Sequence, residues 1–309
     1  MATAGCLKSR PLVGASSHAR AGRPSAPPSR PRLTTTTMAT ASAAARPLQP
    51  PLPTLYDVPV SNYCARVRYV LYSKGLVDGG LVALDKPSAL GGGLQSPEYK
   101  ALNPHAKMPL FHLASGTRLP VGSGSPQGDA LYEADGIVRY ILAKWPAVGP
   151  SFAPPTPEAG ALSDLCIKVM DTYLFPHQGC MYKGGMEPGA RAAGLAAIAG
   201  ELEVLEGLLS GGPRVVGEAW TPADASLFPT LVFCEQILPK HFGWEGFWDK
   251  RPRLAAHYKH MSQADPAGKK VVEEIVGGLA AWEGAEGGGR WEALGIAGQV
   301  RDDPGAFRH

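Results

Sequence analysis

The first 56 residues contain no aspartate and no glutamate, and the first acid of the chain is Asp57. Residues 1–46 carry seven of the 30 lysines and arginines and are rich in serine, threonine, alanine and proline. This composition buries too little apolar surface to offset chain entropy, and it is typical of plastid and mitochondrial transit peptides. We predict a cleavable, disordered leader over residues 1–46 that directs the protein to the chloroplast, with the mitochondrion as second choice. A basic tail that stays attached is the alternative.

The remainder of the chain has no excess of positive charge. The whole chain has 30 cations and 27 acids, a net charge of +3, and without its first 46 residues it has 23 cations and 27 acids, a net charge of −4. The basic balance therefore belongs to the leader, and a nucleic-acid partner is not expected. No apolar run approaches the roughly 18 residues that a membrane-spanning helix needs, so we expect no membrane partner.

Paired cysteines and nucleotide-binding glycine patterns are also lacking. The five cysteines are far apart and form no C-x-x-C pair, which argues against a disulfide framework or a metal site. The three glycines at 91–93 lack the strand–helix context of a phosphate-binding loop. We therefore expect no metal and no nucleotide cofactor.

Hydrophobic spacing divides the rest into two halves. Residues 55–58, 81–84, 108–113 and 131–132 read as strands, with helices expected over 63–75, 96–103 and 135–145. Residues 114–128 form a loop rich in glycine, serine and proline. After a proline-rich connection over 147–157, only helical spacing remains, with helices around 162–173, 195–209, 225–237, 254–261 and 271–282.

Several local motifs fit this order of elements. Residues 59–68 read PVSNYCARVR, residues 103–109 read NPHAKMP, and residues 132–137 read YEADGI. In the helical half, Thr221 and Asp224 are spaced as a helix-capping box, which concerns folding rather than catalysis. Together these segments resemble the glutathione transferases over about residues 54–282.

The resemblance implies a thioredoxin-like α/β domain followed by an all-α domain, the fold of the glutathione transferases. We assign residues 54–146 to the thioredoxin-like, glutathione-binding domain and residues 156–285 to the helical, substrate-binding domain. Residues 286–309 are glycine-rich at their start, and we expect a flexible tail.

The resemblance places the catalytic hydroxyl at Ser61, because several classes of the family carry serine or cysteine five residues before an arginine of the first helix, here Arg66. A hydroxyl at a helix N-terminus can donate to the thiolate of glutathione beside free backbone N–H groups. An ordinary helix cap is the alternative role of Ser61.

The other motifs are expected to hold glutathione itself. The family's cis-proline corresponds to Pro109, so that the backbone of Met108 pairs with the tripeptide and Lys107 meets its glycyl carboxylate. Glu133 would pair with the glutamyl ammonium, and the helix start at Ala134 would bind the glutamyl carboxylate. Where the family usually has glycine and serine, this chain has Ala106 and Ala134, and the second change removes one hydroxyl donor.

The second-substrate pocket is expected in the helical half, at Tyr173, His177, Met181 and Tyr182, and core or surface roles are the alternative for these residues. The resulting hypothesis is a dimeric glutathione transferase that conjugates glutathione to a small apolar electrophile. One alternative is a non-catalytic ligand-binding protein. The other is a glutathione-dependent isomerase or a thiol transferase that uses Cys64. Ser61 alone does not separate conjugation, isomerisation and peroxide reduction.

Overall fold

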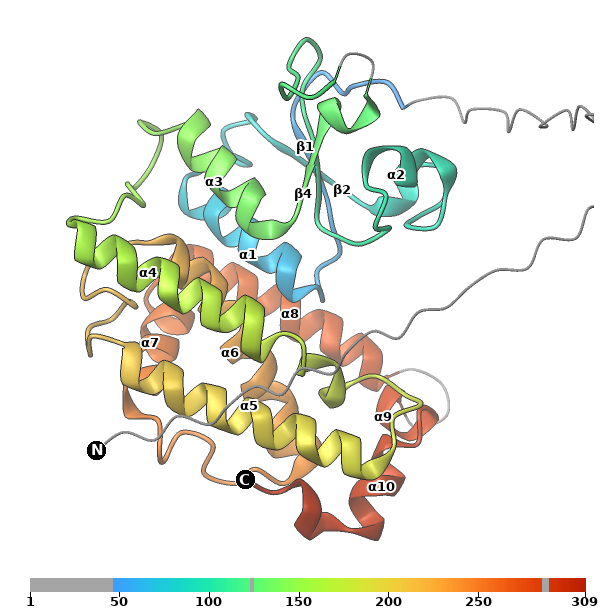
Figure 1. The fold of residues 1–309 in the computed structure, drawn as a ribbon, viewed down its shortest axis with the longest axis vertical. Coiled ribbons are helices and arrows are strands. Elements are labelled where there is room, and N and C mark those ends of the chain that lie inside the picture. The colour runs from blue at the N-terminus through green and yellow to red at the C-terminus, as the bar shows by residue number, and fades with distance from the viewer. Residues whose placement is uncertain (1–46, 123–124, 285–288) are drawn as a thin grey trace, which may run out of the picture. The chain divides into compact units, whose positions relative to one another are not determined.

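The protein is described from a computed structural model, which covers residues 47–122, 125–284 and 289–309. The predicted leader over residues 1–46 lies outside these residues. The predicted fold class is confirmed: a small mixed sheet with three helices precedes an all-helical domain (Figure 1). No helix in the covered segments is both long and apolar enough to cross a bilayer.

Four short strands form the sheet, in the spatial order β2-β1-β3-β4. Strand β1 (Thr54–Tyr56) pairs parallel with β2 (Ala83–Asp85) and antiparallel with β3 (Leu110–His112), which pairs antiparallel with β4 (Ala130–Tyr132). All residues of β1 and β3 are buried, as expected for the two central strands. In the described part of the segment between the last two strands, Arg118 forms an ion pair of 2.7 Å with the fully buried Asp129, close to the start of β4.

Three helices flank this sheet. Helices α1 (Asn62–Ser73) and α3 (Ala134–Lys144) pack against each other beside the helical domain, and α2 (Pro97–Leu102) lies at the other side of the sheet (Figure 1). Helix α1 also packs against α6 (Pro222–Phe242) and α8 (Pro266–Glu283) of the helical domain. It is therefore the main contact between the two halves.

The helical domain is built around α6, which is buried along most of its length as its apolar sequence predicts. Its other helices are α4 (Pro157–Val169), α5 (Pro188–Leu208), α7 (Pro252–Gln263) and α8. Helix α4 continues into a π-helical segment, Met170–Leu174, and a 3-10 helix, Gln178–Met181, follows.

Proline starts most of these helices. It occupies one of the first two positions of α2 and of α4 to α8. Proline suits this place because the N–H group that it lacks would have no partner inside the helix. Thr221 and Asp224 form the predicted capping box of α6.

The end of the chain differs from the prediction of a flexible tail over 286–309. Residues 289–309 contain α9 (Arg290–Ala293), α10 (Ile296–Asp302) and a 3-10 helix, Pro304–Phe307. Trp291, Ile296 and Phe307 are buried against the helical domain, and the Trp291 ring stacks on His241 at 3.8 Å. The prediction was wrong because it followed the glycine content of the segment and gave no weight to these three apolar residues. Their burial offsets the entropy lost when the segment becomes ordered.

A buried histidine lies beside the capping box. His257 and Asp224 are both fully buried, and 3.8 Å separates Nδ1 of His257 from Oδ1 of Asp224. Burial lowers the pKa of His257 to about 3, and burial raises the pKa of Asp224 to about 6. The imidazole is therefore neutral at pH 7, with Nδ1 facing the carbonyl oxygen of Pro213 at 3.2 Å.

We expect His257 to make the fold sensitive to acid. Between pH 6.5 and 3 the unfolded histidine binds a proton that the folded one does not, so the free energy of unfolding falls as pH falls. From pH 7 to 4 the histidine by itself lowers the free energy of unfolding by about 3 kcal/mol, while Asp224, whose pKa is raised to about 6, raises it by about 2 kcal/mol, so the net loss is about 1 kcal/mol. His257→Gln should be less stable at pH 7 and should lose less stability on acidification, measured by urea unfolding from pH 7 to 4. Parallel pH profiles for the two proteins would contradict this assignment.

Candidate active site

A buried arginine fixes the start of α1. Arg68 is 1% exposed; it pairs with Asp57 at 3.0 Å and with Glu274 of α8 at 2.7 Å. Its guanidinium also donates to the carbonyl oxygens of Val58 and Pro59, at 3.1 and 2.6 Å. The loop between β1 and α1 is thereby held against both its own helix and the helical domain.

A glycine of α8 lets this loop approach closely. A Cβ atom on Gly278 would lie 2.6 Å from Cβ of Val60, closer than real Cβ contacts come. Val60 precedes Ser61, so the position of Ser61 depends on the absence of a side chain at residue 278.

Ser61 is the N-cap of α1. Its backbone is extended, and its hydroxyl oxygen accepts a hydrogen bond from the backbone N–H of Cys64 at 3.3 Å. A hydroxyl that accepts in this way keeps its own hydrogen as a donor. The positive end of the helix dipole favours an anion at the same place.

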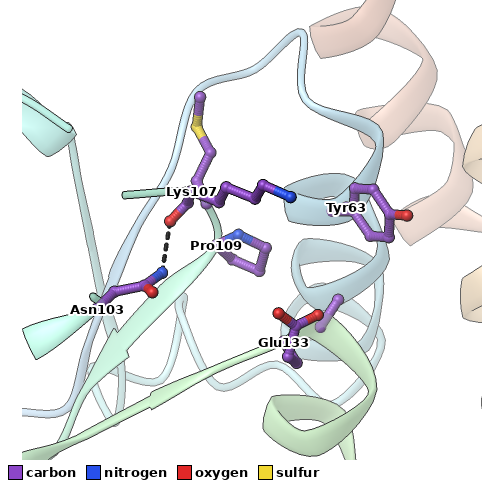
Figure 2. Close-up of a pocket in the computed structure, with 7 residues that line it drawn as sticks. Tyr63, Asn103, Lys107, Pro109 and Glu133 are labelled. Atoms are coloured by element: carbon purple, nitrogen blue, oxygen red, sulfur yellow. Dashed lines mark hydrogen bonds between the residues drawn. The ribbon is translucent and has the colours of Figure 1, made fainter. Parts of the chain in front are cut away.

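A first cavity, of about 110 Å³, lies at the edge of the sheet. It is lined by seven residues: Tyr63, Asn103, Lys107, Met108, Pro109, Glu133 and Ala134. Figure 2 shows the side chains of Lys107 and Glu133 at different sides of Pro109, with the Lys107 chain extending toward Tyr63. The cavity thus offers a cation, an anion, the backbone around Pro109 and the N-terminus of α3.

The turn before Pro109 is held by side chains behind it. Asn103, which is 2% exposed, donates from Nδ2 to the carbonyl oxygen of Lys107 at 2.7 Å (Figure 2). The hydroxyl of Tyr99 donates to the same oxygen at 2.8 Å. The Met108–Pro109 peptide bond is cis, as predicted. Ala106 has φ of +50°, a left-handed conformation that favours glycine.

Glu133 also has an unusual backbone. Its φ is +74°, and it is the N-cap of α3 without a capping hydrogen bond from its side chain. Such a conformation costs about 1–3 kcal/mol in a residue with a side chain and is concentrated at ligand sites. Here the conformation places the carboxylate at the cavity beside the helix start.

A larger cavity, of about 570 Å³, shares Tyr63, Lys107 and Met108 with the first. Its remaining lining comes from residues 94 and 106 and from the segment that follows α4, namely Asp171, Phe175, Pro176, Gln178, Gly179, Tyr182 and Lys183. The two cavities therefore meet at the first turn of α1, one on the sheet side and one on the helical side.

Tyr63 is fixed between these cavities. Its ring lies 4.5 Å from the Phe175 ring, and the guanidinium carbon of Arg66 lies 5.6 Å from its centroid. Arg66 is 2% exposed and makes a two-pronged ion pair with Asp171, at 2.7 and 3.3 Å. Burial raises the pKa of Tyr63 to about 12, so its phenol is a hydrogen-bond donor at neutral pH.

Two family matches cover more than half of the chain. Residues 55–150 match the N-terminal domain of glutathione S-transferase, and residues 188–260 match its C-terminal domain. The chain belongs to the glutathione S-transferase family. No curated protein matches it.

Solved glutathione transferases share the fold at low identity. One is a glutathione transferase, URE2P6, from Phanerochaete chrysosporium in complex with oxidized glutathione, with 24% identity, a TM-score of 0.57 and coverage of 73% of this chain and 96% of that one. Another is glutathione transferase Omega 3C from Trametes versicolor, with 18% identity, a TM-score of 0.55 and coverage of 74% and 89%. Glutathione transferase F7 from Populus trichocarpa has 19% identity, a TM-score of 0.56 and coverage of 72% and 99%.

The structure brings together all five residues that the sequence assigns to glutathione binding. These five line the first cavity: Lys107, Met108, Pro109, Glu133 and Ala134. Sequence reasoning missed Tyr63 and Asn103 as lining residues, although both lie inside quoted motifs. Ser61 is not among the described residues that line either cavity. It is the N-cap of α1 and precedes the lining residue Tyr63 by two positions.

Of the four residues predicted for the second-substrate pocket, Tyr182 lines the larger cavity. Tyr173, His177 and Met181 are not among the described residues lining it. Tyr173 is 56% exposed and His177 faces solvent, whereas Met181 is fully buried in the core. The π-helical turn and the following 3-10 helix have a different number of residues per turn from an α-helix. Because the prediction assumed regular α-helical spacing, it gave the wrong directions for these side chains.

Cys64 is unsuited to thiol exchange. Its side chain is fully buried, and burial raises the pKa of its thiol to about 12. Because the thiolate is the nucleophile, a thiol of this kind stays unreactive at neutral pH. In the part of the chain that the structure covers, no three histidine, cysteine or acidic side chains gather as metal ligands.

We expect Ala106→Gly to stabilise the protein. Glycine adopts the left-handed conformation without the cost of about 1–2 kcal/mol that alanine bears there. Glycine also raises the entropy of the unfolded chain, which lowers the free energy of unfolding by about 0.4–1 kcal/mol. The net gain in the free energy of unfolding, measured in urea, should be about 0.5–1 kcal/mol. Ala101→Gly, inside helix α2, is the matched control and should destabilise by a similar amount. If both glycines destabilise alike, the backbone at residue 106 is not strained.

Proposed function

We propose that this family member is a glutathione transferase that activates the glutathione thiol at the start of α1 and adds it to an electrophile in the larger cavity. The observation that carries the proposal is the junction of the two cavities at Tyr63, Lys107 and Met108. A tripeptide in one cavity and an electrophile in the other would meet at the N-terminus of α1, where an anionic sulfur is favoured.

The first cavity supports glutathione chemically. The backbone of Met108 offers an extended peptide an edge to pair with, because Met108 precedes β3 and is not paired in its strand ladder. The N-terminus of α3 at Ala134 favours a carboxylate, Glu133 favours an ammonium, and Lys107 favours a second carboxylate. The last three groups match the ammonium and the two carboxylates of glutathione in number and sign.

Two hydroxyl groups near the first turn of α1 are candidates for activating the thiol. Ser61, our assignment, caps α1 beside its free N–H groups. Tyr63 lines both cavities, but Figure 2 shows its hydroxyl directed away from Lys107 and Pro109. The Tyr63 phenol therefore lies on the electrophile's side, whereas Ser61 precedes the helix on which a thiolate would rest. A donor to a charged acceptor is worth about 1.5–3 kcal/mol.

We expect Ser61→Ala to lower kcat/KM for a generic aryl halide by on the order of 10- to 100-fold, because the thiolate loses that donor. The pKa of bound glutathione, followed by thiolate absorbance or by the pH dependence of kcat/KM, should rise. Tyr63→Phe should leave this pKa near its wild-type value.

Two controls make the comparison sharp. Thr156→Ala removes a comparable helix cap, that of α4, so it reproduces the loss of stability without touching the site. Retention on immobilised glutathione reports binding separately from turnover. If the pKa of bound glutathione is normal in Ser61→Ala but raised in Tyr63→Phe, then Tyr63 and not Ser61 is the hydrogen-bond donor to the thiolate. Retention without turnover in the wild type would favour a ligand-binding protein.

We also propose a homodimer, following the family resemblance. Two large apolar side chains are exposed on α4 and its π-helical extension, Leu165 at 48% and Tyr173 at 56%. A second copy of the chain would cover such surface.

We propose that residues 1–46 direct the protein to plastids. Fused to a fluorescent protein in plant or algal cells, this segment should accumulate the reporter in plastids as a shortened, processed product. Residues 47–309 fused to the same reporter are the control and should remain in the cytosol. Import into mitochondria would favour a mitochondrial transit peptide instead. A leader fusion that stays unprocessed in the cytosol would contradict both the plastid and the mitochondrial prediction.

A further inference from the structure

The larger cavity has an excess of positive charge. Lys107 and Lys183 line it, and neither ammonium group pairs with an acid among the described residues. Asp171 is the acid in its lining, and the buried Arg66 already neutralises it through two hydrogen bonds. The free charge that an electrophile would meet in this cavity is therefore positive.

Lys183 is held in place at this cavity. The carbonyl oxygen of Lys183 accepts a hydrogen bond of 2.9 Å from the fully buried Arg191. The stem of the lysine lies against Gly179, where an added Cβ would come within 3.0 Å of its Cδ. A fixed backbone and a supported stem reduce the entropy lost when the ammonium group binds an anion.

The rest of the lining adds apolar surface and donors. Phe175, Pro176 and the aromatic faces of Tyr63 and Tyr182 suit a flat, conjugated body. Gln178 also lines the cavity; it is 3% exposed, and its side-chain nitrogen has no acceptor in the segments covered. A buried donor without a partner favours a ligand that carries an oxygen acceptor.

We propose that the electrophile of this enzyme carries a carboxylate on an aromatic or conjugated body, and that Lys183 selects it. This inference rests on the proposed function and replaces the expectation of a purely apolar electrophile. In the proposed function Lys107 binds the glycyl carboxylate of glutathione. Lys183 is then the lysine of this cavity that can bind a carboxylate of the second substrate.

A nitroaryl chloride provides the chemical test. The sulfur of the glutathione thiolate bonds to the ring carbon that bears chlorine, and the carbon–chlorine bond then breaks with its electron pair leaving as chloride. The proton lost by the thiol passes to the solvent. The step needs no oxidant or reductant, and a carboxylate elsewhere on the ring takes no part in it.

The probes are 4-chloro-3,5-dinitrobenzoate and its methyl ester, which differ by one negative charge. For Lys183→Gln we expect the acid-to-ester ratio of kcat/KM to fall about fivefold relative to wild type, the size of a favourable exposed ion pair. In this variant the KM for the acid should rise, whereas the KM for the ester should stay at its wild-type value. Added salt should weaken the wild-type preference for the acid in the same direction.

Lys183→Arg should keep the wild-type ratio, because the charge remains. Lys259→Gln removes an exposed lysine of α7 and should also keep it. If both probes turn over and the ratio is unchanged in Lys183→Gln, the inference fails while the proposed function stands. If the wild type turns over neither probe, the proposed function fails and the inference fails with it.

Discussion

Helix α1 is buried on every side from Cys64 to Leu71, and its polar side chains must find partners without water. Arg66 reaches Asp171 in the helical domain, Arg68 reaches Asp57 and Glu274, and the hydroxyl of Tyr69 bonds to Asp265. Breaking one side of a buried ion pair costs about 3–5 kcal/mol. Helix α1 is therefore the main connection between the two domains, and its first turn separates the two cavities.

This arrangement divides the chemistry between the halves. The sheet side supplies a turn held by Asn103 and Tyr99, a cis-proline and the start of α3, all of them backbone features that suit the peptide of the proposed function. The helical side supplies aromatic faces, one buried amide and one supported lysine, which suit the separate electrophile of the proposed function. Arg66 serves both, because its pairing with Asp171 holds the wall of one cavity while its guanidinium packs near the Tyr63 ring.

Much of the sheet side could be predicted from the sequence, because its signals are local. The order of strands and helices follows from spacing, and the segment from Asn103 to Pro109 predicts its turn and its cis bond. The wall of the larger cavity could not be predicted in the same way. Tyr173, His177 and Met181 lie in a π-helical and 3-10 stretch, where the direction of a side chain depends on hydrogen bonds to distant residues. For the same reason the packed end of the chain was missed, since the burial of Trp291 and Phe307 is visible only once the helical domain is assembled.

The C-terminal helices hold that wall from behind. Arg290 and Trp291 donate to the carbonyl oxygens of Tyr182 and Met181, at 3.0 and 2.9 Å, and Leu294 fills the space beside Gly184. Residues of α9 and the turn after it thus support the wall of the larger cavity, although they lie far along the chain from the elements around Pro109. Substitutions in this segment would therefore alter the wall of the larger cavity without reaching the first cavity, so the proposed preference for an electrophile could change independently of the proposed binding of glutathione.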